Sequence, residues 1–201
     1  MAVVNPKVDG GKPFDWGKAS ADYAKYRDIY PEMFYRQILD AGLCVHGQTV
    51  LDLGTGTGVL PRNLYRYGAQ FVGIDLSPEQ IEQARRLAKQ AGMQIDFFAC
   101  PAESVDFPDH TFDVVTACQC FFYFDAKKLL PNLRRMLRPG GRLAILYMAW
   151  LPGEDPIARA SEQLVLRYNP SWSGGGETRH SIELPPETEM YFTVEQEYLF
   201  D

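Results

Sequence analysis

Short apolar runs alternate with amphipathic segments through the first three quarters of the chain. The runs predict buried strands, and the segments between them place apolar residues at the helical repeat. The predicted strands are residues 49–53, 70–75, 94–99, 112–118 and 143–148. The predicted helices are residues 31–41, 59–67, 78–91, 127–137 and 157–168. This alternation predicts an α/β fold with a doubly wound, mainly parallel sheet.

The helix boundaries carry recognisable capping signals. Ser77, followed by Gln80, is typical of a capping box at the start of a helix. Asp125 is the expected N-cap of the helix over residues 127–137. Pro131 conflicts with that helix, because proline removes a backbone donor and should kink the helix or move its start.

The periodic pattern weakens after residue 150. We expect residues 1–13 to be a flexible tail and residues 14–150 to be the α/β core. Residues 151–201 then supply a helix, a loop or cap over residues 169–190, and a final strand over residues 191–200 of the same domain.

Composition limits the class of protein. The chain has 201 residues, 46% of them hydrophobic, which predicts one domain with a substantial core. The net charge of −6 argues against a nucleic-acid partner bound through phosphates. No apolar run is long enough for a membrane span, and no signal peptide is evident. The four cysteines are read as reduced thiols, and we expect a cytoplasmic protein.

The strongest chemical signal is the glycine turn after the first predicted strand. Gly54, Gly56 and Gly58 occupy alternate positions between that strand and the next helix. Such a turn lets bare backbone N–H groups approach a ligand, although a tight loop without a ligand is the alternative. Val59 stands where the dinucleotide fingerprint has its third glycine. Asp52 would repel a pyrophosphate but would suit a ligand that carries an ammonium group.

A second carboxylate, Asp75, ends the second predicted strand. An acidic residue about 20 positions beyond such a turn binds the ribose diol in nucleotide-binding α/β folds. The alternative is that Asp75 helps to cap the next helix, a role that Ser77 fills better.

These segments resemble the class I S-adenosylmethionine (SAM) methyltransferases, specifically the type 11, UbiE-like group of small-molecule enzymes. The matching motifs are Asp52-x-Gly54-x-Gly56-x-Gly58, Gly73-Ile74-Asp75-Leu76-Ser77, Ala102-Glu103, Phe112-Asp113 and Leu137-Arg138-Pro139-Gly140-Gly141. Asp106 replaces a leucine of the family pattern. The family's sheet order is 3-2-1-4-5-7-6. Only one candidate strand follows the fifth here, so we expect an incomplete last strand pair.

The resemblance implies SAM as the cofactor, S-adenosylhomocysteine as its product, and methyl transfer by SN2 displacement to a small-molecule acceptor. It places Asp52 near the ammonium group, backbone at Gly54 and Gly56 at the methionine part, and Asp75 on the ribose. The resemblance also makes residues 14–150 a Rossmann-like core with an N-terminal lid, whose aromatic and arginine side chains would close over the methionine end. The alternative is that this segment only packs its rings on the domain surface. The implied cofactor-binding residues are Tyr23, Arg27, Asp52, Gly54, Thr55, Gly56, Thr57, Gly58, Asp75, Leu76, Ala102, Glu103, Cys118 and Gln119.

The acceptor side carries fewer signals. Tyr123 and Trp150 are the candidate substrate contacts, and Tyr123 and His180 are the candidate general bases. Cys118 and Cys120 could suggest a metal, but no second pair of ligands lies nearby, so we expect none. A non-catalytic SAM-binding protein remains an alternative. A nicotinamide-dependent oxidoreductase is another, which Val59 and Asp52 argue against.

Overall fold

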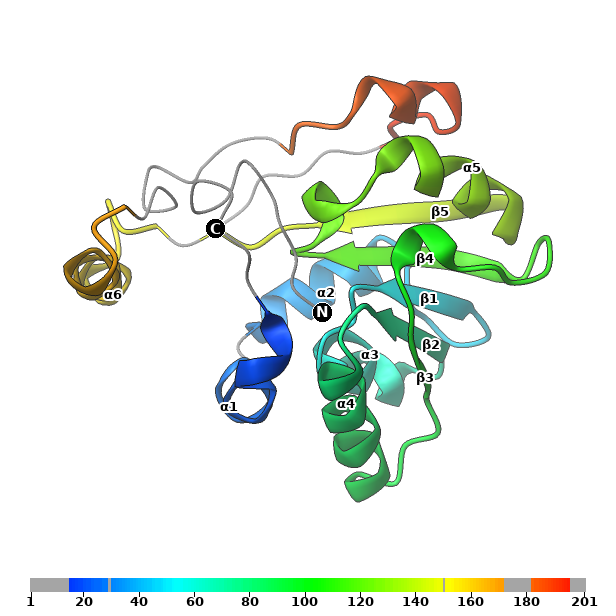
Figure 1. Ribbon diagram of the computed structural model, residues 1–201. Coiled ribbons are helices and arrows are strands. Elements are labelled where there is room, and N and C mark those ends of the chain that lie inside the picture. Colours follow the sequence, from blue (N-terminus) through cyan, green and yellow to red (C-terminus); the bar gives the residue numbers. More distant parts are fainter. Residues whose placement is uncertain (1–14, 29, 150, 172–181, 196–201) are drawn as a thin grey trace. The chain divides into compact units, whose positions relative to one another are not determined.

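The computed structural model describes residues 15–28, 30–149, 151–171 and 182–195. Five parallel strands form one sheet in the order β3-β2-β1-β4-β5 (Figure 1). The strands are β1 Thr49–Leu53, β2 Gln70–Asp75, β3 Asp96–Ala99, β4 Phe112–Cys118 and β5 Leu137–Leu146. The α/β class and the parallel sheet predicted from the sequence are therefore confirmed. The predicted tail over residues 1–13, Trp150 and His180 lie outside the described residues.

Helices and short 3₁₀ turns connect these strands. The α-helices are α1 Ser20–Tyr26, α2 Glu32–Asp40, α3 Val59–Leu64, α4 Pro78–Gln90, α5 Ala126–Met136 and α6 Pro156–Tyr168. The 3₁₀ turns are η2 Trp16–Ala19, η3 Tyr65–Tyr67, η4 Ala102–Ser104, η5 Phe121–Tyr123 and η6 Pro186–Met190. The capping signal at Ser77 is confirmed, since its side chain accepts a hydrogen bond from the Gln80 backbone N–H at 3.3 Å.

The core lies on both sides of the central strands. Val50, Leu51 and Leu53 in β1 are fully buried, and β4 is buried over most of its length. Consecutive buried residues indicate that both faces of these strands are covered, as in other parallel sheets. The centre of the sheet is thus a rigid base for the loops that follow each strand.

Strand β5 differs from its prediction. It begins at Leu137, which pairs with Phe112, and regular pairing resumes between Val114 and Arg142. The Pro-Gly-Gly segment is therefore an irregularity within the strand and not a turn before it. The reason is that Thr111 N–H bonds the Met136 carbonyl at 2.8 Å, which brings the chain onto β4 early.

Helix α5 runs through Pro131 without a new start. Its other face buries Leu129, Leu130, Leu133 and Met136 completely. Burial of several large side chains offsets the roughly 3 kcal/mol that an interior proline costs. The expectation that Pro131 would move the helix start is therefore wrong.

The predicted final strand is not formed over residues 191–195, the part that the structure describes. The backbone N–H groups of Tyr191 and Phe192 both bond the Thr188 carbonyl, which closes η6 and leaves neither group for a sheet. Glu195 reaches β5 through an ion pair with Arg142 at 3.7 Å. Residues 196–200 of the predicted strand lie outside the described part.

The chain divides into two compact units. One holds residues 16–146 and 185–195, and the other includes residues 147–184. In the second unit, Asp155 caps α6 by accepting the Ile157 backbone N–H at 2.7 Å. Ile157 and Tyr168 of that helix are exposed. That residues 151–201 belong to the same domain as the core stays a prediction.

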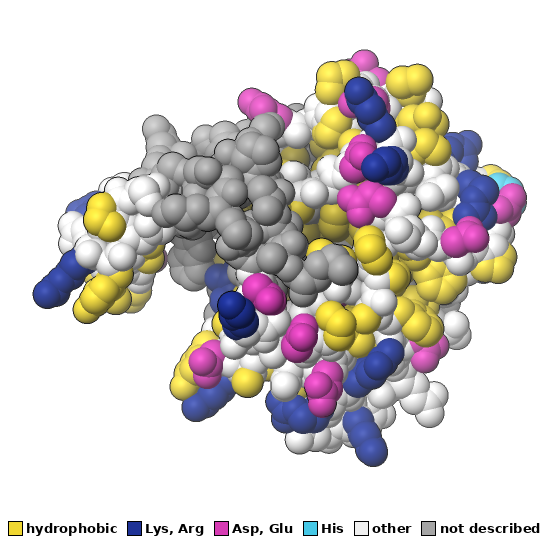
Figure 2. Space-filling model, viewed as in Figure 1, with side chains coloured by type: hydrophobic (Ala, Val, Ile, Leu, Met, Phe, Trp, Pro, Cys, Tyr) yellow, Lys and Arg dark blue, Asp and Glu magenta, His cyan; other side chains and the backbone are white. Residues whose placement is uncertain are grey.

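Charged side chains of both signs are interspersed over α4 and α5 on the face drawn in Figure 2. None of the helices in the described residues has an apolar stretch sufficient to cross a bilayer.

Candidate functional site

The glycine turn joins β1 to α3 at the carboxyl edge of the sheet. Gly54, Gly56 and Gly58 have φ values of +59°, +56° and +75°, which L side chains rarely adopt. A Cβ on Gly54 would lie 2.8 Å from the Cys120 sulfur, so packing alone requires that glycine. A Cβ on Gly56 would meet only the Tyr23 ring, at 3.9 Å. The turn is therefore open at Gly56, on the side of the predicted lid residue Tyr23.

Asp75 is tied directly to this turn. Its Oδ2 accepts the Gly56 backbone N–H at 2.8 Å, and its Oδ1 accepts the Ser77 N–H at 2.9 Å. Burial raises the pKa of Asp75, and these two hydrogen bonds partly oppose that rise. The capping alternative is thus partly correct, because Asp75 orders the turn that precedes α4.

The hydrogen bonds of the turn correct the expectation that its backbone N–H groups are bare. Thr55 N–H bonds the Ile74 carbonyl at 2.8 Å, and Gly58 N–H bonds the Thr55 carbonyl at 2.9 Å. Together with the bond from Gly56 to Asp75, these leave three N–H groups of the turn with protein acceptors. The turn therefore does not present a row of bare donors. It presents the carboxylate of Asp75, already oriented by the backbone.

Asp52 lies beneath the turn at the end of β1 and is 2% exposed. The Thr116 hydroxyl, its register partner on β4, donates to Oδ1 at 2.6 Å. Burial raises the pKa of Asp52 to about 6, although the Thr116 bond favours the charged form. In the part of the chain that the structure describes, no Lys or Arg forms an ion pair with this carboxylate. A ligand cation beside it would lower its pKa and hold it ionised.

Tyr23 lies in α1, and Arg27 is the residue that follows this helix. The Arg27 guanidinium lies over the Tyr23 ring, 5.4 Å from the ring centroid, and is half-buried. Among the described residues it forms no ion pair with a carboxylate. A half-buried guanidinium without a counter-ion, beside an open glycine turn, can bind a carboxylate in two-point fashion.

Two thiols follow at the end of β4. Cys118 hydrogen-bonds the Tyr30 hydroxyl, and burial raises its pKa to about 12. Cys120 donates to the Leu53 carbonyl at 3.1 Å, and burial raises its pKa well above the usual range. Gln119 between them has φ of +64°, a strained conformation that turns the two thiols to different partners. Over the described residues, no group of three metal-ligating side chains occurs.

The remaining predicted residues lie farther along the same edge. Ala102 is buried in η4, and Glu103 accepts the Asp125 backbone N–H at 2.8 Å. Asp125 occupies the N-cap position of α5, but its side chain caps no backbone group and pairs with Lys128. Glu103 is therefore a structural contact as well as a candidate ligand. Tyr123 is half-buried, with its ring centroid 4.3 Å from that of Phe122.

Leu76 is half-buried after β2, and Thr55 and Thr57 are buried within the turn. The structure thus brings the predicted residues of the turn, of β2 and of the N-terminal segment together. Two contacts escaped sequence reasoning, namely Thr116 on Asp52 and Tyr30 on Cys118. The first was readable in principle, because the predicted sheet order places β4 beside β1. The second was not, because no periodic signal fixes residues between α1 and α2.

The fold and this edge define the class of protein. The family described as the methyltransferase domain matches residues 51–145, from β1 to the end of β5. A SAM-dependent methyltransferase structure from Aquifex aeolicus aligns with a TM-score of 0.57 at 22% identity, covering 85% of this chain and 93% of that one. At this identity the match shows the fold alone, and the class I methyltransferase fold predicted from the sequence is confirmed.

Two curated relatives are more similar in sequence. A demethylmenaquinone methyltransferase from Thermus thermophilus is 40% identical over 114 residues, which is 55% of this chain and 52% of the relative. A ubiquinone biosynthesis O-methyltransferase from Cereibacter sphaeroides is 32% identical over 133 residues, 66% of this chain and 54% of the relative. The chain spans about half the length of these relatives.

Proposed function

We propose that this protein binds SAM at the carboxyl edge of β1, β2 and β4 and transfers its methyl group to a small-molecule acceptor. The product of the cofactor is then S-adenosylhomocysteine. The observation that carries the proposal is the bond from Gly56 N–H to Asp75, which joins the glycine turn to the acidic residue. The methyltransferase domain match over residues 51–145 supports it.

The ribose fits Asp75 on chemical grounds. Each carboxylate oxygen has two lone pairs, and one on each is used by the Gly56 and Ser77 N–H groups. One acceptor site on each oxygen remains, and a vicinal diol can donate to both. The backbone bonds also fix the rotation of the carboxylate, so that binding the diol costs little side-chain entropy.

The methionine end fits the two unpaired charges. It carries a carboxylate and an ammonium group on one carbon. Arg27 is a half-buried cation without an anionic partner, and Asp52 is a buried carboxyl without a cationic partner, over the described residues. We assign the ligand carboxylate to Arg27 and its ammonium to the side of Asp52. Tyr23, beside Gly56, would cover this end of the ligand.

SAM itself supplies the activated electrophile, a methyl group on a positively charged sulfur. The protein then has to orient the acceptor in line with that bond and exclude water. Tyr30, Cys118 and Cys120 all have pKa values raised by burial, so they keep their protons at neutral pH. They line the site as neutral groups and do not serve as bases. Tyr123 remains the candidate base among the described residues.

The acceptor we propose is a flat, apolar small molecule. The two curated relatives are named for demethylmenaquinone and for ubiquinone biosynthesis. In this chain Phe122 is 54% exposed just after β4 and packs on Tyr123. An exposed phenylalanine packed on a half-buried tyrosine at the carboxyl edge can stack on a ring. We also propose a cytoplasmic location, consistent with four free cysteines.

Calorimetric titration with SAM and with S-adenosylhomocysteine tests the cofactor, and NADH is the control ligand. We expect micromolar binding of both sulfur ligands and none of NADH. Incubation with SAM and a panel of hydroxylated aromatic acceptors then tests turnover, with S-adenosylhomocysteine release as the readout. Binding of NADH in place of the sulfur ligands would overturn the proposal. Binding without turnover on any acceptor would favour a non-catalytic SAM-binding protein.

A further inference from the structure

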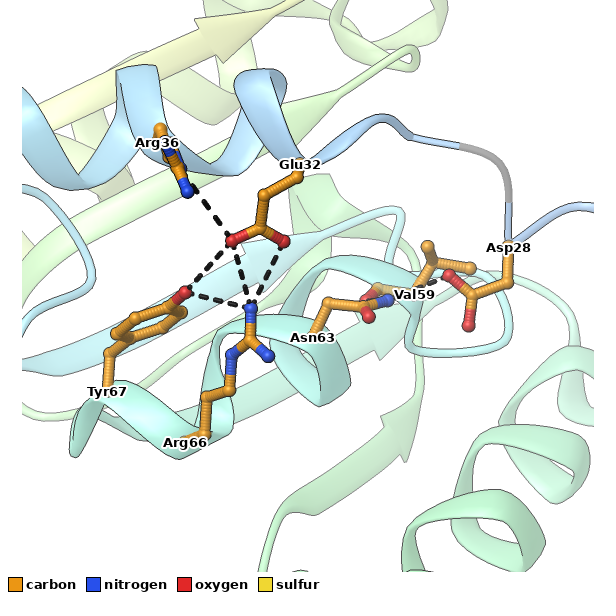
Figure 3. Close-up of polar contacts among 7 residues, drawn as sticks. All are labelled: Asp28, Glu32, Arg36, Val59, Asn63, Arg66 and Tyr67. Carbon is orange, nitrogen blue, oxygen red and sulfur yellow. Dashed lines mark hydrogen bonds and ion pairs between the residues drawn. The ribbon is translucent and has the colours of Figure 1, made fainter.

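A set of polar contacts joins the N-terminal segment to the helix that follows the glycine turn. Asp28 comes directly after Arg27, and its Oδ1 accepts a hydrogen bond from the Asn63 amide at 2.8 Å (Figure 3). Its Oδ2 lies 3.4 Å from a guanidinium nitrogen of Arg62. Arg62 and Asn63 both belong to α3, which begins at the glycine turn.

Of these two side chains, Arg62 also contacts the glycine turn, whereas Asn63 contacts the first residue of α3. Arg62 Nε donates to the Thr57 carbonyl at 3.3 Å, and the Asn63 amide donates to the Val59 carbonyl at 2.9 Å. Arg62 therefore contacts both Asp28 and the turn, and Asn63 contacts both Asp28 and the first residue of the helix that follows the turn. Through these bridges, the position of Asp28 is fixed relative to the glycine turn.

The surroundings make this contact stronger than an ordinary surface ion pair. The Arg62 side chain is only 13% exposed and the Asp28 side chain 41%, and Asp28 is the one carboxylate paired with Arg62 among the described residues. Low exposure reduces screening by water, and loss of Asp28 would leave a largely buried guanidinium without a counter-ion. We therefore expect the contact to hold the backbone at residue 28 in one place.

A second cluster on the same segment provides the contrast. Glu32 accepts from Arg66 at 3.1 Å and lies near Tyr67 and Arg36, as Figure 3 shows. The side chains of Glu32 and Arg66 are 51% and 62% exposed. Exposed pairs of this kind contribute little. The Glu32 cluster joins α2 to η3 and contacts neither the turn nor Arg27.

We propose that Asp28 is a positioning residue for the cofactor site. Through Arg62 and Asn63 it fixes the segment that carries Arg27 and Tyr23 against the glycine turn, so that the Arg27 guanidinium is held where the ligand carboxylate arrives. Asp28 itself does not touch the ligand. This inference rests on the proposed function, because it assigns to Arg27 the carboxylate of the SAM methionine end.

The test compares two ligands on Asp28→Ala and on the isosteric Asp28→Asn. S-adenosylhomocysteine carries the carboxylate, whereas 5′-methylthioadenosine keeps the nucleoside and lacks the amino acid part. We expect Asp28→Ala to weaken S-adenosylhomocysteine about 10-fold, within the usual range for coupling between a remote contact and a binding site. 5′-Methylthioadenosine should bind the wild type and the Asp28→Ala variant equally. Glu32→Gln is the matched control and should change neither affinity by more than about 2-fold.

A double-mutant cycle shows whether Asp28 acts through Arg27. In an Arg27→Ala background, Asp28→Ala should cost little further affinity, because the group it positions is gone. Additive losses, or equal weakening of both ligands, would overturn the inference and indicate a general effect on the fold. The Asp28→Asn protein, which keeps the shape of the side chain, serves if Asp28→Ala does not fold.

The outcomes separate the two proposals. If the wild-type protein binds no S-adenosylhomocysteine, the proposed function fails and this inference fails with it. If the wild type binds and the Asp28 variants bind equally well, only the positioning role is wrong. With a known acceptor, the positioning role also predicts a raised KM for SAM at nearly unchanged kcat, since uniform binding is lost.

Discussion

Carboxyl groups at the amino and carboxyl edges of the sheet have pKa values shifted in opposite directions. At the amino edge, Asp113 accepts from Thr49 N–H at 2.8 Å and pairs with Arg138 at 2.6 Å. Burial alone would raise the pKa of Asp113, yet these partners lower it below its usual value. At the carboxyl edge, burial raises the pKa of Asp52 to about 6.

We propose that this contrast separates the charges that serve the fold from those that bind a ligand. A structural carboxylate has its partners within the protein, and its charged form is stabilised. A carboxylate that binds a ligand lacks a cationic partner within the protein and can pair with a charged group of the ligand. Asp52 and Arg27 both have this character at the carboxyl edge. Strained or perturbed groups cluster at functional sites for the same reason.

The largest expected effect is on ligand affinity, which should depend on Asp75 but not on Asp113. Asp75→Ala removes both acceptors of the diol and frees the Gly56 N–H, so we expect affinity for S-adenosylhomocysteine to fall by about 100-fold or more. Asp113→Ala is the matched control at the other edge. It should lower stability but change affinity by less than about 2-fold. Calorimetry on both variants measures this, and equal losses would erase the contrast between the edges.

Asp52→Asn should stabilise the protein in the absence of ligand. The folded-state pKa of Asp52 is raised from 3.8 to about 6. Its protonated form thus favours the fold at low pH, and that advantage is lost as the pH rises through 6. At pH 8 the buried charge costs on the order of 3 kcal/mol, which the neutral amide removes.

Urea unfolding at pH 5 and pH 8 measures the effect of Asp52→Asn. The gain should be larger at pH 8, and the same variant should bind S-adenosylhomocysteine more weakly. A variant that is less stable than the wild type at pH 8 would mean that the ionised Asp52 already has an adequate partner.

Arg27→Ala should weaken S-adenosylhomocysteine by about 20-fold, since a charge-assisted two-point contact is lost. It should leave 5′-methylthioadenosine unaffected, because that ligand has no carboxylate. Arg138→Ala, which removes a cation at the amino edge, is the control for net charge. If Arg138→Ala weakened binding as much, the effect would be long-range electrostatics and not a direct contact.

The smallest effect concerns stability at the amino edge. Because its pKa is lowered in the folded state, Asp113 stabilises the protein above the usual carboxyl range, and this contribution disappears as the pH falls through its folded-state pKa. Asp113→Asn should therefore cost about 1 kcal/mol at pH 7, with Arg138 partly exposed. Thermal unfolding at a series of pH values from 7 down to about 2 checks this. The cost should shrink as the pH falls below the usual carboxyl range, and a cost that is unchanged at the lowest pH would contradict the account.

Much of the fold was predictable because its signals are local. Strands β1, β2 and β4 have the predicted limits, since each is a mainly apolar run bounded by turn residues. The capping signal at Ser77 was predictable for the same reason. The start of β5 was not, because its pairing with Phe112 depends on contacts distant in sequence.

The site was predictable in its motifs but not in its contacts. Gly54, Gly56 and Asp75 could be named from spacing. The bond between Gly56 and Asp75 could not, because the predicted sheet order places β1 beside β2 but does not say which backbone group the Asp75 side chain accepts from. The same holds for Asp28 and Arg62, whose residue types would suit any surface.

Amide hydrogen exchange with and without S-adenosylhomocysteine tests the central claim most directly, since it reads both edges of the sheet in one experiment. The account predicts added protection in residues 23–28, 53–58 and 75–77, at the carboxyl edge, and none in residues 111–114 or 137–142, at the amino edge. Protection at the amino edge, or no protection at either edge with saturating ligand, would contradict it.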